Sequence, residues 1–367
     1  MIVVEKPALA TWQRERNMLR RKIFANEPNW AAYPDYVEKK ILNQKKNPFW
    51  KNKSLIPILG KRRGVTGCTA ALIVPAGNEE STIWFGFFDA VFDPELIAAV
   101  VKELENAAKA AGASNVVGPA NPNLYYEPGI QVDGFRCSSA PGLVISPPYY
   151  AELLEGQGFT KANDLLGLII PTHSACPPPL RYASRLGKRQ GITIAQADLK
   201  QSETLIEKMA VFHAASFGKN WGEPRMSRDE VAFLWSMFRD LIDRRLVLLA
   251  HDIHGELVGI ALAIPNHTDM FRKLKRAKTP IGSLLALASF GEVDSVRLAI
   301  FGIHPDHRLG PAAGALLGAL WEPVQAIGAR FCEISWVLEN NHNLLAMLES
   351  VGAIRERRWR VFTKPLN

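Results

Sequence analysis

The chain has 367 residues, a length that exceeds one ordinary domain and suits two. Its hydrophobic share of 47% is that of a soluble globular protein, and no segment has the long uncharged apolar run of a membrane helix. The formal net charge of +8 favours acidic partners such as phosphorylated cofactors, acidic carrier proteins or nucleic acid. Residues 1–22 contain glutamates and lack an apolar core with a small-residue cleavage site, so we expect no signal peptide and a cytoplasmic protein.

The cysteines argue against a metal centre or a disulfide framework. Cys68, Cys137, Cys176 and Cys332 are widely spaced, and no CxxC pair occurs. Such a pattern is typical of reduced, structural thiols in a cytoplasmic protein. We therefore expect no bound metal ion.

The first half alternates strand-like and helix-like segments. Asp93 and Pro94 precede a long apolar-periodic run, which predicts a capped helix reaching Gly112. A second, shorter helix is expected at 147–159. Enrichment in β-branched and aromatic residues predicts strands at 54–59, 66–75, 82–92 and 164–170, and a short strand at 114–122 that breaks into a Gly/Pro loop.

A proline-rich segment separates the two halves. Residues 171–180 contain three consecutive prolines, which cannot continue a helix or a central strand. We expect a linker there and a boundary near residue 180, giving domains 1–180 and 181–367.

The second half repeats the same order of elements. Asp198 with Gln201 and Ser227 with Glu230 predict capping boxes that open two helices, 202–218 and 231–245. A hairpin, a strand–turn–helix, a strand, a helix and a last strand follow, at 246–265, 293–318, 329–337, 341–353 and 358–366. This order requires an α/β fold with a mixed sheet.

The stretch 301–318, FGIHPDHRLGPAAGALLG, marks a candidate anion site. A strand ends in a proline turn, and a basic pair and Gly-Pro then lead into an Ala/Leu-rich helix. The first amides of such a helix have no intrahelical partner, and the helix dipole places partial positive charge there. We therefore expect this helix N-terminus to bind an anion.

These residues resemble the GNAT (general-control-related N-acetyltransferase) superfamily of acyl-CoA-dependent acyltransferases. The resemblance rests on 298–317 for the cofactor strand and pyrophosphate loop, on 331–353 for the next strand and helix, and on similar stretches of the first half. The whole chain looks like a tandem-GNAT protein of the mostly bacterial group whose roles are unassigned. The resemblance implies an α/β (α+β) fold with two GNAT-like domains in tandem, each a mixed twisted sheet flanked by helices.

The loop departs from the family pattern of Arg/Gln-x-x-Gly-x-Gly/Ala. If Arg308 is aligned with the first position of the pattern, Pro311 stands where the family has its central glycine. If His307 is aligned with the first position, Gly310 and Ala312 match the pattern, but histidine replaces the arginine or glutamine. Gly302, at the strand end, permits a bulge and a close backbone approach. The resemblance implies that acyl-CoA or acetyl-CoA, or the phosphopantetheine arm of an acyl carrier protein, contacts Phe301, Gly302, Ile303, His307, Arg308, Leu309, Gly310, Pro311, Ala312, Ala313, Asn340 and Asn341.

Amine acylation requires a base, and the acid that many relatives use is absent. The family often places a tyrosine four residues before the glycine that ends the penultimate helix, and here that position is Leu348. Candidate bases are Glu333, Glu339 and His304, with Glu292 also considered. Alternation within 331–337 predicts that Glu333, Ser335 and Val337 share one strand face.

The first half has no comparable phosphate loop. Its aromatic strand leads into the following helix through Asp89, Asp93 and Glu95, which would repel phosphate. We therefore interpret this half as a degenerate copy that forms one wall of the acceptor site. Expected substrate-binding residues are Trp221 in the second half and Asn123, Tyr125 and Tyr126 in the first.

The insertion 266–291 interrupts the second sheet. Its first part is basic with interleaved Met270, Phe271 and Leu274, and its second part is apolar. This pattern fits a packed helical hairpin, a cover over an acyl-chain tunnel, or a docking element for an acidic carrier or a membrane surface.

The function that these patterns favour is N-acyl transfer. The donor is CoA or an acidic acyl carrier protein, and the acceptor is the amine of a peptide, an amino acid or a natural-product intermediate. Alternatives are an aminoacyl-tRNA-dependent transferase and a non-catalytic pseudo-acyltransferase that binds a ligand or partner. Positive charge alone does not indicate nucleic acid, and we do not expect it as a partner.

Overall fold

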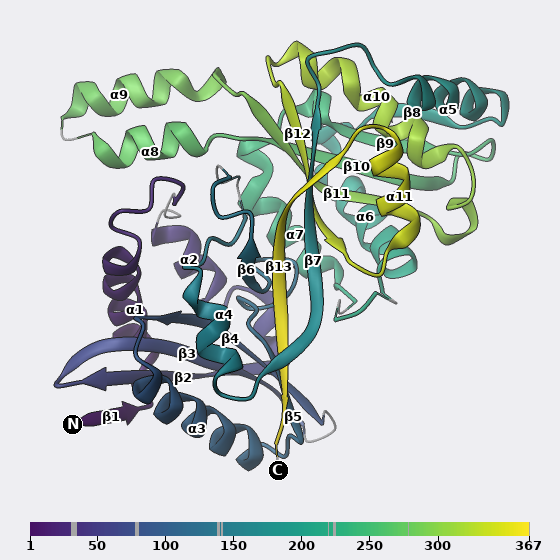
Figure 1. The fold of residues 1–367 in the computed structure, drawn as a ribbon. Coiled ribbons are helices and arrows are strands. Elements are labelled where there is room, and N and C mark those ends of the chain that lie inside the picture. The colour runs from purple at the N-terminus through teal and green to yellow at the C-terminus, as the bar shows by residue number, and fades with distance from the viewer. Residues whose placement is uncertain are drawn as a thin grey trace. The chain divides into compact units, whose positions relative to one another are not determined.

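Two compact units make up the protein in a computed structural model (Figure 1). The structure describes residues 1–30, 35–77, 81–137, 140, 142–218, 220–222, 225–277 and 279–366. Unit 1 comprises Met1–Ser138, Gly142–Leu165 and Arg357–Asn367. Unit 2 comprises Ser139–Pro141 and Leu166–Glu356.

The chain passes between the units inside two long strands rather than at the proline-rich segment. It leaves unit 1 within β7 (Thr160–Pro171) and returns within β13 (Ile354–Pro365). This division differs from the expected boundary near residue 180. The prolines do not form a linker, because Pro178 and Pro179 occupy the first turn of α5 (Pro178–Arg189), where a missing N–H is tolerated.

Unit 1 is a mixed sheet with helices on both faces. Strands β1 to β4 pair antiparallel in chain order, and β4 pairs parallel with β5. Helix α3 covers one core cluster, and α1 contributes to another on the opposite face. The elements are β1 (Ile2–Glu5), α1 (Leu9–Ile23), α2 (Asp35–Ile41), β2 (Lys53–Arg62), β3 (Val65–Pro75), β4 (Thr82–Ala90), α3 (Pro94–Ala110), β5 (Asn115–Gly118), β6 (Ile130–Asp133) and α4 (Tyr149–Glu155).

Local signals placed α3 correctly. The Asp93 carboxylate accepts a hydrogen bond from the Leu96 amide at 3.1 Å, which confirms the predicted cap. The two chain ends also join this unit, a feature that no local pattern indicated. Strand β1 pairs with β2, and β13 pairs with both β5 and β6.

Unit 2 has the same pattern of strand pairing as unit 1. Strands β8 to β11 pair antiparallel, and β11 pairs parallel with β12, so the expected mixed sheet flanked by helices is confirmed. The elements are α5, β8 (Thr193–Gln196), α6 (Ser202–Ser216), α7 (Arg228–Phe238), β9 (Val247–His251), β10 (Leu257–Pro265), α8 (Thr268–Arg276), α9 (Pro280–Ala288), β11 (Ser295–Ile303), α10 (Ala312–Ala326), β12 (Phe331–Leu338) and α11 (His342–Ser350).

An apolar core lies on each face of this sheet. Helix α10 packs with α5 and α11 on one face, and α6 with α7 packs on the other. Ser227 and Glu230 form the predicted capping box at α7. Asp198 instead caps a short 3₁₀ turn, Leu199–Gln201, that precedes α6. Among the helices of the described ranges, none combines the length and apolar character needed to cross a bilayer.

Candidate active site

The two central strands of unit 2 separate part-way along their length. Their parallel register runs from Ser295 opposite Phe331 to Leu298 opposite Ile334 and ends there. Both strands continue beyond this point, and the side chains from Ala299 to Phe301 are only partly buried. This edge of β11 therefore presents main-chain groups that β12 does not pair.

A bulge bends β11 at the point of separation. Leu262 of β10 pairs with Ile300 and Ala263 pairs with Leu298, so Ala299 is the extra residue. Gly302, which the sequence suggested could permit a bulge, instead pairs regularly with Ile260.

Gly302 is small for another reason. A Cβ atom at this position would overlap the ring of Phe217 and lie 3.0 Å from Cε1 of Phe212. The main chain at Gly302 is therefore approached closely by the aromatic rings of Phe212 and Phe217, at the end of α6.

The N-terminus of α10 lies after this strand and carries no side-chain cap. The amide of Ala315 donates to the carbonyl of Pro311 at 2.9 Å, so the amides of Ala312, Ala313 and Gly314 precede the first helical hydrogen bond. Leu309, in the loop before the helix, is 96% exposed. The predicted anion site thus has three main-chain amides at its helix end, and Pro311 removes one further amide.

Arg308 is an exposed residue whose guanidinium binds main-chain carbonyl groups of the protein itself. Its Nη2 donates to the carbonyl of Ser216 at 2.6 Å, and its Nε donates to the carbonyl of Ile303 at 3.4 Å. Since Ser216 is the last residue of α6, the guanidinium satisfies a carbonyl that the helix leaves open. Two nitrogens of the predicted phosphate ligand thus bind the main chain.

The two histidines of the loop lie close to each other. Their ring centroids are 6.4 Å apart. The main-chain amide of His304 donates to Val258 at 2.8 Å, and its Nδ1 lies 3.5 Å from Asp306 Oδ2. His307 donates its own amide to the carbonyl of His304 at 2.9 Å.

A buried charge of each sign lies on one face of β11 and β12. Arg297 and Glu333 are register partners and are each 5% exposed. Arg297 donates through Nε and Nη2 to the hydroxyl and carbonyl oxygens of Ser335, both at 3.1 Å, and covers the ring of Trp336 at 4.3 Å. The predicted alternation fails after Ser335, because Val337 packs in the opposite core with Cys332 and Ile334.

The remaining candidates lie where β12 leads into α11. The Asn341 side chain accepts a hydrogen bond from the Leu344 amide at 3.4 Å and caps the helix, while Asn340 is exposed and Glu339 half-buried.

Cys332, next to Glu333 on β12, is not a nucleophile at neutral pH. Burial, with a smaller contribution from Glu333, raises the pKa of its thiol to about 12.

Solved structures share the fold of this chain. A tandem GNAT protein from the clavulanic acid biosynthesis pathway superposes with a TM-score of 0.56 at 12% identity, over 100% of this chain and 98% of that one. A GCN5-related N-acetyltransferase from Sphaerobacter thermophilus gives 0.53 at 16% identity, over 100% and 96%. The chain has the tandem GNAT fold.

Curated relatives match this tandem GNAT chain over nearly its whole length. It is 26% identical to a protein named bacterial ceramide synthase from Caulobacter vibrioides (strain NA1000 / CB15N), over 95% of this chain and 93% of that protein. It is 25% identical to protein YghO of Escherichia coli (strain K12), over 94% and 90%. No family model matches the chain.

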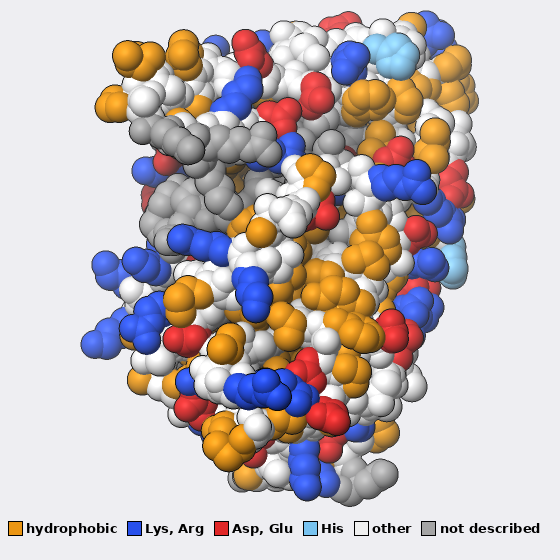
Figure 2. All heavy atoms as spheres, turned by 60° about the vertical axis from the view of Figure 1, so that its left-hand side comes forward, with side chains coloured by type: hydrophobic (Ala, Val, Ile, Leu, Met, Phe, Trp, Pro, Cys, Tyr) orange, Lys and Arg blue, Asp and Glu red, His pale blue; other side chains and the backbone are white. Residues whose placement is uncertain are grey.

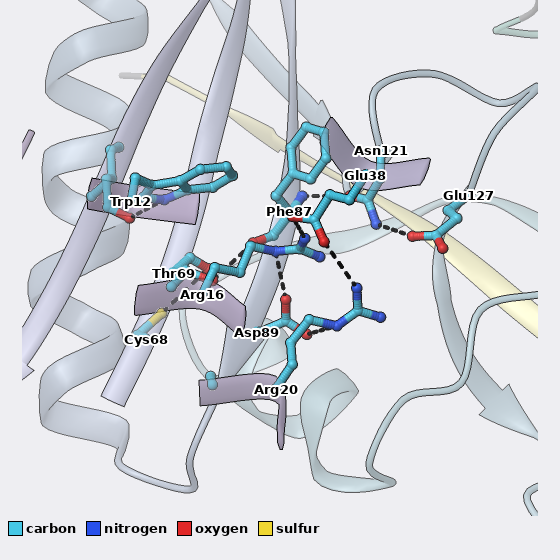
Figure 3. Close-up of polar contacts among 12 residues, drawn as sticks. Trp12, Arg16, Arg20, Glu38, Cys68, Thr69, Phe87, Asp89, Asn121 and Glu127 are labelled. Atoms are coloured by element: carbon cyan, nitrogen blue, oxygen red, sulfur yellow. Dashed lines mark hydrogen bonds and ion pairs between the residues drawn. The ribbon is translucent and has the colours of Figure 1, made fainter. Parts of the chain in front are cut away.

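The first GNAT unit has the same strand separation, but its own loop fills it. Parallel pairing of β4 with β5 ends at Trp84 opposite Val117. Beyond it, the Ala120 amide donates to Phe85 O at 2.9 Å, and the amide of Phe87 donates to the Asn121 side chain (Figure 3).

The glycine and the helix N-terminus of this unit agree with that closure. A Cβ atom on Gly86 would overlap the carbonyl oxygen of Ala120, so Gly86 allows the loop to enter. Asp93 occupies the N-terminus of α3 and is bound by Arg62 at 2.5 Å, which holds the pKa of Asp93 below its usual value. Unit 1 therefore closes the strand edge of β4 and the helix end of α3, the positions equivalent to β11 and α10 of unit 2.

A buried ionic cluster lies beneath β4 of this unit. Arg16 pairs with Glu38 at 2.7 Å and with Asp89 at 2.8 Å, and Arg20 lies 3.6 Å from Asp89 (Figure 3). The sequence does not single out Arg16 and Glu38, because charged residues in a helical segment are typical of a solvated face. The only signal was Asp89 within an aromatic strand.

The predicted substrate-binding residues are divided between the units. Trp221 lies half-buried between α6 and α7 of unit 2. Asn123, Tyr125 and Tyr126 belong to unit 1, where Asn123 accepts the Tyr125 amide at 2.9 Å in a turn and Tyr126 is 7% exposed. The residues from Phe301 to Ala313 and Glu333 do belong together, around β11, β12 and α10. Within the described parts of the chain, no three His, Cys, Asp or Glu side chains form a group that could hold a metal ion.

Proposed function

We propose that this chain is an N-acyltransferase that moves an acyl group from a thioester to an amine. One observation carries the proposal. Unit 2 leaves open both the edge of β11 beyond Leu298 and the N-terminus of α10, whereas unit 1 fills both equivalents with its own atoms. Of the two units, unit 2 is therefore the one with room for a donor.

The donor matches these two features chemically. A pantetheine arm carries amide groups along an extended chain, which an unpaired strand edge recognises through main-chain hydrogen bonds. We assign this contact to residues 299–303. The pyrophosphate of coenzyme A is an anion suited to a helix N-terminus, and we assign it to residues 307–313. Asn340 and Asn341, at the end of β12, flank the same opening in this proposal.

A side chain of the protein accepts the first proton released during the transfer. Bound acyl-CoA supplies an activated thioester. The attacking ammonium gives one proton to a base, its nitrogen bonds to the acyl carbon, and the C–S bond breaks; a second proton passes from nitrogen to sulfur. We assign the base to Glu333, which is 5% exposed on β12 beside the opening. Glu339 and His304 are the other candidates.

We further propose that the acceptor is a long-chain amino alcohol and that the acyl chain is long. This part rests on the relative named bacterial ceramide synthase, which aligns over 95% of this chain. A ceramide is the amide that forms when a fatty acyl group is transferred to such an amine. Coenzyme A and an acyl carrier protein remain the two alternative donors.

The test uses the full-length protein with sphinganine. It is incubated separately with acetyl-CoA, palmitoyl-CoA and palmitoyl carrier protein, and amide formation is measured by mass spectrometry. We expect the amide from at least one long-chain donor and little from acetyl-CoA. A ligand of the native state also raises the melting temperature by mass action. Absence of both the amide and any thermal shift would refute the proposal.

A further inference from the structure

Helix α9 directs its apolar stripe outward. Ile281, Leu284 and Leu285 are 73%, 68% and 68% exposed, and Ala288 is exposed as well. These positions follow the i, i+3, i+4, i+7 spacing of one helix face. The side chain that turns inward is the small Ala286, at 3% exposure. A helix that packs only within a protein in water has this pattern reversed.

The surroundings of the stripe extend it and then turn basic. Leu287 and Phe290 are 51% and 43% exposed, and Figure 2 shows apolar side chains gathered at the upper left of the displayed face. Residues 280–288 read PIGSLLALA and contain no charge, whereas residues 272–276, at the end of α8, read RKLKR. The Lys273 side chain is 54% exposed and lies 3.5 Å from Glu292, and Arg272 is paired with Asp269 at 2.5 Å.

We propose that the α8–α9 hairpin docks on an anionic lipid bilayer, with the α9 stripe among the acyl chains and Lys273 of α8 at the headgroups. An apolar face with neighbouring Lys and Arg residues is the arrangement by which helices lie in a membrane interface. Basic residues add attraction to anionic lipids, within a short distance of the surface. An acidic carrier protein would explain the basic run, but it would leave four aliphatic side chains in water.

Membrane binding by α9 does not depend on acyl transfer, although it is consistent with the lipid acceptor of the proposed function. Vesicle binding is measured without donor or acceptor, so a failure here leaves the activity assay untouched. An active enzyme that does not bind vesicles would likewise leave the proposed function standing.

The experiment is co-sedimentation of the full chain with vesicles of phosphatidylcholine alone and of phosphatidylcholine mixed with phosphatidylglycerol. The test variant is L284N/L285N. The matched control is Val211→Asn, which changes a side chain that is 74% exposed on α6. Circular dichroism establishes that each variant is folded. We expect the parent and the control to bind the anionic vesicles, and binding to fall about tenfold in L284N/L285N and in high salt.

Three results would overturn the proposal. The first is equal sedimentation of the parent with and without vesicles. The second is equal binding by the parent and L284N/L285N. The third is a parent that forms a dimer without lipid and becomes monomeric in L284N/L285N, which would make the stripe an interface between two copies. If the stripe binds an acidic carrier protein and no vesicles, the parent sediments equally with and without vesicles, and the proposal is overturned.

Discussion

Nη2 of Arg308 donates to the carbonyl oxygen of Ser216 at 2.6 Å, which links the loop before α10 to the C-terminal end of α6. The loop residue that the sequence suggested for phosphate thereby stabilises the loop itself. The proposed anion site then consists of main-chain amides, whose direction depends on that support.

Replacing Arg308 by methionine should therefore lower both stability and donor affinity. Loss of hydrogen bonds to a charged group costs about 1.5–3 kcal/mol when they are buried, and about 1 kcal/mol is expected here because this site is part-exposed. Urea unfolding measures the first effect and the KM for the acyl donor the second. Arg308→Lys keeps the charge but loses the fork geometry, so partial rescue is expected. Unchanged values for both measurements in Arg308→Met would contradict this role.

Gly310→Asp should place a carboxylate beside the uncapped N-terminus of α10. Asp93 is the N-cap of α3, whereas position 310 lies one residue before Pro311, the N-cap of α10, and a Cβ on Gly310 lies 3.4 Å from the carbonyl oxygen of His307. A carboxylate there is attracted by the partial positive charge of the helix end and repels a phosphate, so stability should rise by about 0.3–1 kcal/mol while donor binding weakens about tenfold or more. The readouts are urea unfolding and the dissociation constant of acyl-CoA. Gly310→Ala is the control and should retain donor affinity; tight donor binding by the aspartate variant would exclude this terminus as the phosphate site.

Glu333→Gln should reduce kcat and leave donor affinity intact. A positioned base contributes about 10²–10⁴-fold to rate, so we expect a loss of about a hundredfold or more. The buried amide keeps the shape of the side chain. Steady-state kinetics as a function of pH separates the roles, because a lost base removes the acidic limb of the profile. If Glu339→Gln or His304→Gln has this effect and Glu333→Gln does not, the assignment moves to that residue.

Gly86→Ala should destabilise unit 1, because the new methyl group meets the carbonyl of Ala120. Overpacking against main chain costs about 1–3 kcal/mol, and we expect the upper part of that range. Gly291→Ala is the matched control, since nothing lies within 4 Å of its Cβ position. Urea unfolding of both variants decides the matter, and equal stability would show that the loop at Ala120 yields readily.

His213 should make the protein less stable in mild acid. Burial lowers the pKa of His213 to about 4, below the value of about 6.5 for an unfolded histidine. Protonation therefore favours the unfolded chain, and the associated stability is lost as pH falls from about 6.5 towards about 4. Between pH about 7.5 and about 5 the loss is on the order of 1–2 kcal/mol after allowance for solvent screening. In His213→Phe this share of the pH dependence should vanish; an unchanged dependence in urea unfolding would rule it out.

Local chemistry made parts of this molecule predictable. The caps at Asp93 and at Ser227 depend on side chains within three residues, and both are present as expected. The uncapped terminus of α10 follows equally from Gly-Pro, which offers no side-chain acceptor.

Features that depend on distant partners were not predictable in this way. The bulge lies at Ala299 because of the register against β10, which no pattern within 295–303 reveals. Arg16 and Asp89 are 73 positions apart by their numbers, and their pairing appears only when α1 covers β4. The inward turn of Arg308 likewise needs the end of α6 in place.

The two chain crossings within β7 and β13 bear on synthesis. Phe362 has no exposed surface in the core of unit 1, and its strand pairs with β5, so this unit is completed by residues near position 365. The stretch 166–356 of unit 2 leaves the ribosome before them. The N-terminal part of unit 1, although made first, must wait with a gap in its sheet until residues 357–365 have been synthesised, and the unpaired edge of β5 is exposed on the nascent chain during that time.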